Sequence, residues 1–272
     1  MTSITTILVL LATGIGVGLA QGLLGLGGAF IMVPVLILLF AWQDIPVDTA
    51  VPLAFGTSLS VAFATAISSA WAHSREGDVW WKAAMILGLS GAMGALVGST
   101  LTSQVIAGEI MRSVFGVATI VSGAAMLVSR ERDYEEKARD NPLLWSIWGF
   151  PVGVSVGILG IGGGIVLIPL MTIVLKFKMH RAVGTACGTM LFTTSFGALG
   201  YLLNGLGAKD LPSASIGYIN IVAFLCLVAT SLVTAQVATR IGHRLTERVL
   251  KIVFVSLMLY LGLRMIGLFE WL

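Results

Sequence analysis

The chain has 272 residues, of which 57% are hydrophobic and 11% are charged, and its net charge is +3. Its mean hydropathy is +0.99. This composition excludes an ordinary soluble domain and indicates a polytopic membrane protein. The basic residues lie in short connections between apolar segments, so the small net charge does not indicate nucleic acid as a partner.

Long apolar segments follow one another, and each is predicted to form a helix. The first set is 4–24, 29–41, 49–72, 80–102 and 108–129. After a charged linker, 130–143, the second set is 144–163, 164–177, 182–204, 213–240 and 246–269. The start of the chain lacks the basic region and cleavage site of a signal peptide, so we expect it to be the first membrane segment.

A glycine-rich motif is present twice. Its first copy, 22–29, reads GLLGLGGA, and its second copy, 157–164, reads GILGIGGG. The shared glycines are displaced by 135 residues, as are the prolines that follow, Pro34 and Pro169. Glycine costs about 1 kcal/mol relative to Ala in a helix interior, so each copy predicts a break in its helix. The backbone groups freed there need partners other than lipid, so a ligand is expected at the two breaks.

Further similarity extends the duplication to nearly the whole chain. Residues 50–59 align with 182–191 at an offset of 132, and a Phe, Gly, Met pattern within 115–126 recurs within 254–265 at an offset of 139. The chain is therefore predicted to consist of two repeats, 1–129 and 144–272, joined by the linker.

Charge distribution decides between two arrangements of 4–41. Its second part has only about 13 residues, roughly 20 Å as a helix, and cannot span a bilayer core of about 30 Å. If 4–41 crosses once, the two faces carry seven basic residues each. If it is a re-entrant hairpin, thirteen lie on one face and three on the other. The positive-inside rule favours the hairpin.

Each repeat then has one hairpin, 4–41 or 144–177, and three transmembrane helices. This odd number of crossings gives the repeats opposite orientations, with the linker in the cytoplasm and both termini on the other side. We therefore expect an all-α polytopic membrane protein with two inverted-topology repeats. Inverted repeats are common in secondary transporters, which bind their substrate near the midplane of the membrane, between the repeats.

The hairpin tips are the predicted binding site for a small anion. The second arm of each hairpin begins a helix, whose first N–H groups are unpaired and carry the positive end of the dipole. Glycine lets an anion approach this backbone closely. Hydroxyl groups are expected to complete the site, with Thr185, Thr193 and Thr194 as further candidates. The predicted substrate-binding residues are Gly25, Gly27, Gly28, Ala29, Thr57 and Ser58 in the first repeat, and Gly160, Gly162, Gly163, Gly164 and Thr189 in the second.

Helix packing is the alternative role for some of the glycines. Five glycines have the spacing that brings membrane helices close together, namely Gly14, Gly18, Gly22, Gly153 and Gly157. Thr57 and Thr189 could instead bond to their own helices. Cys187 and Cys226 lie in apolar segments and are expected to be small buried side chains rather than disulfide partners or metal ligands.

The sequence shows no nucleotide fingerprint, nucleophile–base pair or metal-ligand cluster, so neither an enzyme nor a cofactor is expected. Arg112 and Arg264 lie near the outer ends of their segments and are expected to extend toward water, with a role in an outer vestibule as the alternative. No acid or histidine, His73 included, is clearly placed for a proton relay, so coupling to a proton or another ion is left open.

The doubled motif in two similar apolar halves resembles the TauE/SafE family of membrane permeases over essentially the whole chain. Ala29 departs from the pattern of the second copy, which has Gly164. Family members are described as exporters of sulfite and of sulfur-containing organic anions. The resemblance implies a secondary transporter of the inner membrane that exports sulfite, sulfoacetate or a related sulfonate. An anion channel, or a membrane enzyme or scaffold, is the alternative.

Overall fold

The computed structural model describes residues 4–24, 27–104, 108–128, 140–208 and 211–242, with 255–256, 259–260, 262–263 and 266. Nearly all of them are helical. The helices are α1 (Ile4–Leu24), α2 (Ala29–Ala41), α3 (Val47–Arg75), α4 (Trp81–Gln104), α5 (Gly108–Val128), α6 (Pro142–Leu159), α7 (Gly164–Pro169), a π-helical turn (Leu170–Val174), α8 (Met179–Asn204) and α9 (Ile221–Gly242).

Six helices within the described residues are long and apolar enough to cross a membrane, namely α1, α3, α4, α6, α8 and α9. Large apolar side chains such as Leu8, Leu89 and Val233 lie on the outside. An outer surface of this kind is stable against lipid rather than water. The prediction of an all-α polytopic membrane protein is therefore confirmed.

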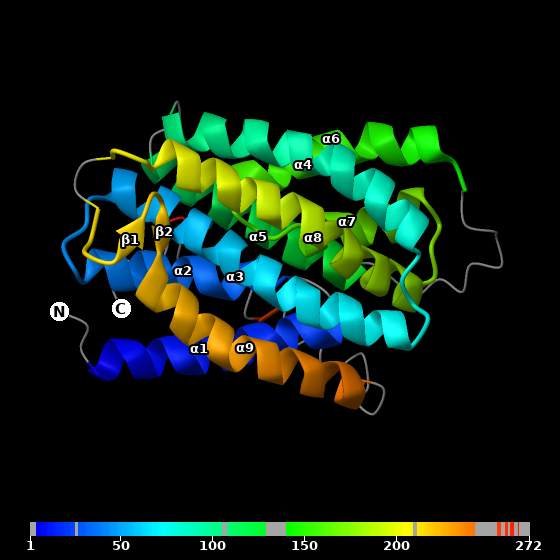
Figure 1. Ribbon diagram of the computed structural model, residues 1–272, viewed down its shortest axis with the longest axis horizontal. Coiled ribbons are helices and arrows are strands. Elements are labelled where there is room, and N and C mark those ends of the chain that lie inside the picture. The colour runs from blue at the N-terminus through cyan, green and yellow to red at the C-terminus, as the bar shows by residue number, and fades with distance from the viewer. Residues whose placement is uncertain are drawn as a thin grey trace.

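α3 and α8 are the central helices. In their apolar windows 78% and 61% of the residues are buried, against 28–50% in the other four membrane-spanning helices. α3 and α8 pack against each other, α3 also packs against α9, and α8 also packs against α4. Figure 1 shows this pair in the middle of the bundle, with α1 and α9 on one side and α4 and α6 on the other.

Glycines bring the flanking helices into close contact. A Cβ on Gly14 or Gly18 of α1 would lie 2.7 Å from Leu227 O or 2.5 Å from Ser231 O of α9. The backbone of α4 approaches Gly153 of α6 in the same way. Gly22 and Gly157 have equally close backbone neighbours on α9 and α4. These five glycines therefore pack helices, as their spacing indicates.

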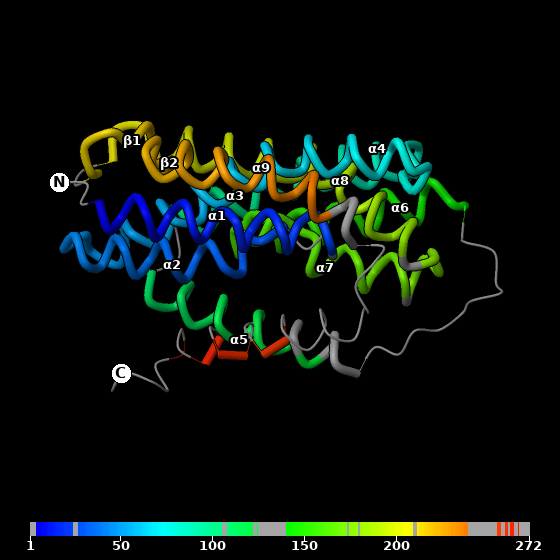
Figure 2. The backbone as a smooth tube through the Cα atoms, turned by 90° about the horizontal axis from the view of Figure 1, so that it is seen from below, coloured from blue at the N-terminus to red at the C-terminus, as the bar shows by residue number. Residues whose placement is uncertain are grey.

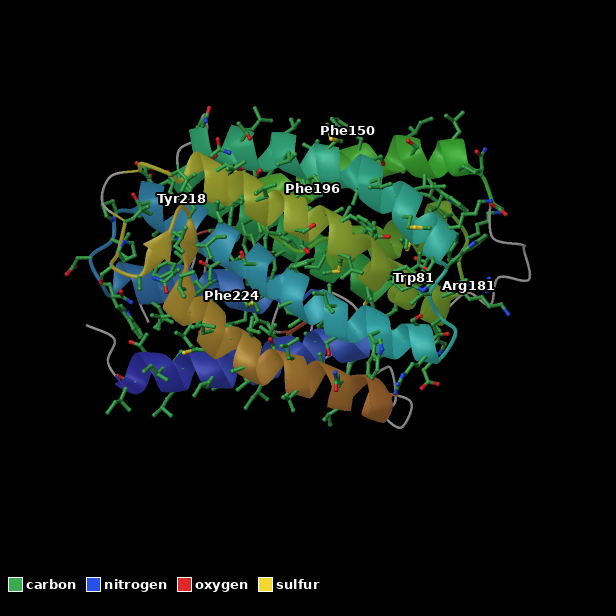
Figure 3. All side chains as sticks on the ribbon, viewed as in Figure 1. Trp81, Phe150, Arg181, Phe196, Tyr218 and Phe224 are labelled. Atoms are coloured by element: carbon green, nitrogen blue, oxygen red, sulfur yellow. The ribbon has the colours of Figure 1, made fainter. Side chains whose placement is uncertain are left out.

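Connections from both parts of the chain meet at one end of the molecule. Trp80, in the α3–α4 connection, stacks on Phe177 with ring centroids 5.2 Å apart. The backbone N–H of Trp80 donates to Thr185 Oγ1, near the start of α8, at 3.0 Å. Figure 3 places Arg181 at this end and Tyr218 at the other. If the segment 4–41 crossed the membrane once, the α3–α4 connection and the connection before α8 would lie on opposite faces of the membrane. The boundaries and orientation of the two repeats stay predictions.

Each glycine break separates two helical arms. α1 and α2 lie side by side as the first hairpin (Figure 2). After the second break, α7 ends at Pro169 and the chain continues as the π-helical turn, with Leu175 N donating to Leu170 O at 3.1 Å. Proline lacks the N–H that a regular α-helical turn would use. The segment 164–177 is thus not one regular helix.

The predicted helix 213–240 begins too early, because α9 starts only at Ile221. Before it lie two short strands, β1 (Ser215–Ile216) and β2 (Ile219–Asn220), which pair antiparallel. Gly217 has φ 54° at the first central position of the turn, where this tight hairpin favours glycine. The Asn220 side chain then accepts a hydrogen bond from Ala223 N and caps α9. The linker 130–139 and most of the predicted helix 246–269, including Arg264, lie outside the described residues.

Candidate functional site

The two glycine motifs are breaks in left-handed backbone conformation. Gly27 and Gly28 have φ of 85° and 60°, and Gly162 and Gly163 have φ of 60° and 96°. Gly28 immediately precedes α2 and Gly163 immediately precedes α7. Residues with a side chain rarely adopt such values, which explains the glycines. Gly25 lies outside the described residues.

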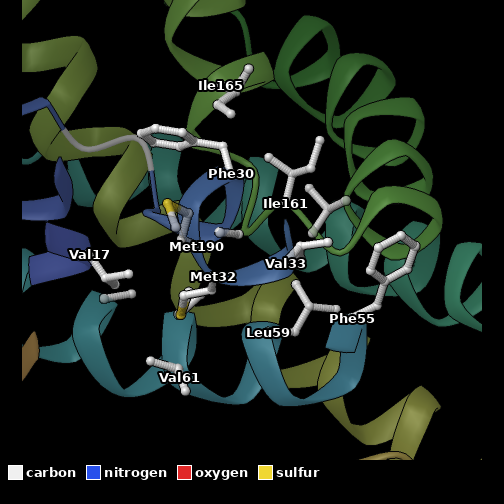
Figure 4. Packing of buried hydrophobic residues seen from close by; sticks show 14 of the residues in the cluster. Val17, Phe30, Met32, Val33, Phe55, Leu59, Val61, Ile161, Ile165 and Met190 are labelled. Carbon is white, nitrogen blue, oxygen red and sulfur yellow. The ribbon is translucent and has the colours of Figure 1, made fainter. Parts of the chain in front are cut away.

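The two tips meet in the middle of the bundle. A Cβ built on Gly27 would lie 3.5 Å from Gly162 Cα, and one built on Gly162 would lie 3.6 Å from Gly27 Cα. The same two positions face Met190, near the middle of α8, and Gly162 also faces Ala62, near the middle of α3. Figure 4 shows Met190, Phe30 and Ile161 among the buried side chains around this point. The tips therefore touch each other at mid-length of both central helices.

The hydroxyl groups of Thr57, Ser58 and Thr189 each have a partner within the protein. Ser58 Oγ donates to Gly160 O at 2.9 Å and so attaches α3 to the second tip. Thr57 Oγ1 accepts from Asn220 N at 2.9 Å, just before α9. Thr189 Oγ1 donates to Thr185 O of its own helix at 2.9 Å. Ala29 and Gly164, the first helical residues after the tips, are buried.

The contacts of the central helices pair Thr57 with Thr185. Each hydroxyl accepts the N–H of the residue that precedes a helix, Asn220 before α9 or Trp80 before α4. Thr57 and Thr185 are 128 residues apart, whereas the sequence alignment uses an offset of 132 and pairs Thr57 with Thr189. The alignment is therefore about one helical turn out of register with the contacts. A shift of four residues keeps the same helix face, so the hydrophobic pattern does not detect it.

Gln21, which the motif analysis missed, lies beside the first tip. Its side chain is fully buried, and its Nε2 lies 3.7 Å from Cys187 Sγ. Its Oε1 has no hydrogen-bond partner among the described residues. A sequence signal was present, because Gln21 is the one amide side chain in the segment 4–24.

Thr193, one of the further candidates, lies beside the second tip. It is 1% exposed, and its Oγ1 would be 3.7 Å from a Cβ on Gly163. This hydroxyl also has no hydrogen-bond partner within the described part of the chain. The structure thus brings one incompletely bonded polar side chain to each tip. Where residues are described, no group of three His, Cys, Asp or Glu side chains is placed to hold a metal.

Known proteins resemble this chain over most of its length. A probable membrane transporter protein of Methanocaldococcus jannaschii is 28% identical over 257 residues, 94% of each chain. Another from Haemophilus influenzae is 28% identical over 263 residues, 96% of this chain and 98% of its own. Probable membrane transporter protein YdhB of Bacillus subtilis is 30% identical over 194 residues, 69% of this chain and 76% of its own. No solved structure matches the chain significantly.

The family comparison covers the glycine tips and both central helices. Residues 10–265 match the model of the family described as sulfite exporter TauE/SafE. This match includes all but the first few and last few residues of the chain. The chain therefore belongs to the TauE/SafE family and is a membrane transporter.

Proposed function

We propose that this transporter exports a small sulfur-containing oxyanion, such as sulfite, sulfoacetate or a related sulfonate, and binds it at the two glycine tips. The observation that carries the proposal is the contact between Gly27 and Gly162 at mid-length of α3 and α8. This contact brings the starts of α2 and α7 close together, and the N–H groups of a helix start favour negative charge. The description of the family as sulfite exporters supports the substrate class.

The backbone of the tips supplies most of the proposed site. In the proposed site, the N–H groups of 27–29, Gly162 and Gly164 bind the anionic oxygens. Those of Gly160 and Gly163 donate to Val156 O and Ile161 O and so hold the shape of the second tip. Ser58 holds the second tip through Gly160 O, while Thr57 and Thr189 lie on the helices behind the tips. The tips touch in the conformation described here, so the anion binds when they separate. In this proposal the tips separate as one repeat moves against the other, the kind of movement by which secondary transporters alternate access.

A matched pair of glycine variants tests the site. Gly162 and Gly207 both have positive φ, 60° and 87°, but nothing lies within 4 Å of a Cβ on Gly207. Each alanine substitution should cost about 1–2 kcal/mol of backbone strain. Only Gly162→Ala should abolish the thermal stabilisation of the purified protein by sulfite or sulfoacetate. Full stabilisation of Gly162→Ala by either anion would contradict the tip site, and no stabilisation of the wild type would contradict the substrate class.

Flux measurements distinguish the transporter mechanism from an anion channel. In proteoliposomes, uptake of labelled sulfite should saturate, and sulfite on the opposite side should accelerate it. Both effects follow from a site that faces one side at a time. Flux that rises linearly with concentration and ignores anion on the opposite side would favour the channel.

A further inference from the structure

We propose that Gln21 and Thr193 are the side chains that recognise the substrate, and that the substrate carries a hydrogen-bond donor as well as its negative charge. This inference rests on the proposed function and narrows its substrate class. It is carried by two buried polar side chains, one beside each tip, with unpartnered oxygen atoms in the described part of the chain.

Two contacts place the Gln21 amide beside the first tip. A Cβ on Gly28 would lie 3.0 Å from Val17 Cα, and Gln21 is four residues further along α1, on the same face. The amide Nε2 lies 3.7 Å from Cys187 Sγ. Cys187 is about one turn before Met190, whose methyl group lies against Gly27 and Gly162. Gln21 is therefore within about one helical turn of the tip contact.

A buried amide of this kind is costly in a membrane helix. An unsatisfied buried acceptor costs about 1–3 kcal/mol, and polar side chains inside the membrane usually have a function. Because Nε2 faces the Cys187 sulfur, Oε1 is the atom left without a partner among the described residues. A donor on the substrate would satisfy it.

Thr193 differs from its counterpart on the other central helix. At the offset of 128 defined by the helix-start contacts, Thr193 corresponds to Thr65 on α3. Thr65 Oγ1 donates to Val61 O at 2.9 Å and to Ala62 O at 3.1 Å, the usual arrangement of threonine in a helix. Thr193 Oγ1 has no such bond, and it lies beside Gly163. Its hydroxyl is available to donate to an anion.

The two side chains differ in the groups they can bind. The tip N–H groups and the Thr193 hydroxyl donate, so they bind anionic oxygens. Gln21 Oε1 only accepts, so it needs a donor. A fully ionised inorganic oxyanion offers acceptors alone. The donor is therefore the O–H of a protonated oxyanion such as hydrogensulfite, or a hydroxyl or ammonium group on an organic sulfonate.

The first arm of the test uses two sulfonates of similar shape, 2-hydroxyethanesulfonate and propane-1-sulfonate. The second has a methyl group in place of the hydroxyl. If the donor is a hydroxyl group on an organic sulfonate, the wild type should bind the hydroxyl compound about 10-fold more tightly, as expected for one hydrogen bond. Gln21→Leu, or Gln21→Met as a second variant of similar length, should bind both compounds about equally. Thr193→Val should weaken both to the same extent, and the matched control Thr65→Val should change neither.

The second arm measures sulfite binding over a range of pH. It tests whether the donor is the O–H group of hydrogensulfite. If the donor is the proton of the oxyanion, the wild type prefers hydrogensulfite to fully ionised sulfite, and Gln21→Leu loses this preference. In that case the two sulfonates are not distinguished. A preference confined to the sulfonates identifies the organic source.

The outcomes separate this inference from the proposed function. If Gln21→Leu keeps the preference of the wild type, or if the wild type shows no preference in either arm, the role of Gln21 is wrong while anion binding stands. Equal affinities of Thr193→Val and wild type would contradict the role of Thr193. If no anion tested binds the wild type, the proposed function itself fails.

Discussion

At the residue scale, the hydroxyl groups on the central helices connect segments far apart in the sequence. Thr57 and Asn220 are 163 residues apart, and Thr185 and Trp80 are 105 residues apart. In each pair the threonine accepts an N–H that has no intrahelical partner. These two threonines therefore join the central helices to the starts of α9 and α4.

Replacing either of these threonines by valine should lower the stability of the fold. Thr57→Val leaves the buried N–H of Asn220 unsatisfied, and Thr185→Val leaves the part-buried N–H of Trp80 unsatisfied. The loss should cost about 1–3 kcal/mol at Asn220 and less at Trp80. Thr189→Val is the matched control, because Thr189 Oγ1 donates to Thr185 O of its own helix, and it should cost less. Unfolding of the purified variants in detergent measures the difference. Equal stability of all three variants would contradict these capping roles.

At the element scale, the glycine-lined contacts hold the outer helices to each other. α1 packs along α9 and α4 packs along α6, with glycines where the backbones come closest. Membrane helices gain no hydrophobic energy by leaving lipid, so close packing stabilises these pairs. The glycines of this packing and those of the tips therefore have different roles within one motif.

Two glycines of α1 that differ in packing test this role. A Cβ on Gly18 would lie 2.5 Å from Ser231 O, whereas the nearest atom to one on Gly16 is Ile31 Cδ1 at 3.9 Å. Gly18→Ala should destabilise the protein by about 1–3 kcal/mol. Gly16→Ala should be neutral or slightly stabilising, because alanine favours the helix. Similar melting temperatures for the two variants would argue against close packing of α1 on α9.

At the scale of the whole molecule, exposed basic side chains gather at the end where the α3–α4 connection meets α8. Arg75, Lys82, Lys178 and Arg181 lie there, and Lys82 pairs with Asp140 at 3.2 Å. At the opposite end lie Leu206 and Tyr218. We propose that the basic end is cytoplasmic, following the positive-inside rule.

Cysteine labelling tests this orientation. In a background without Cys187 and Cys226, an impermeant maleimide should label Leu206→Cys in intact cells. Glu76→Cys, at the basic end, should react only after the cells are permeabilised. Both positions are exposed, so accessibility within the protein does not differ. The opposite labelling pattern would invert the orientation of the transporter.

The membrane class, most of the helices and the two breaks could be predicted from the amino-acid sequence. A bilayer sets the length of each apolar segment, and that length is visible without any tertiary contact. Helix α1 and helix α2 accordingly coincide with the segments 4–24 and 29–41. The glycine clusters were equally visible, since few other residues tolerate the positive φ of Gly28 and Gly163.

Which residues lie together at the tips could not be predicted without the contacts between helices. The pairing of Thr57 with Thr185 depends on hydrogen bonds to distant helix starts, and a shift of one turn leaves the hydrophobic pattern unchanged. The hairpin before α9 depends on the turn at Gly217 and the helix cap at Asn220. The apolar character of the segment 213–240 indicates neither feature. The environment of the buried Gln21 side chain includes Cys187 of α8, 166 residues away along the chain. Burial and hydrogen bonding are properties of contacts between segments, and composition and spacing along one segment do not contain them.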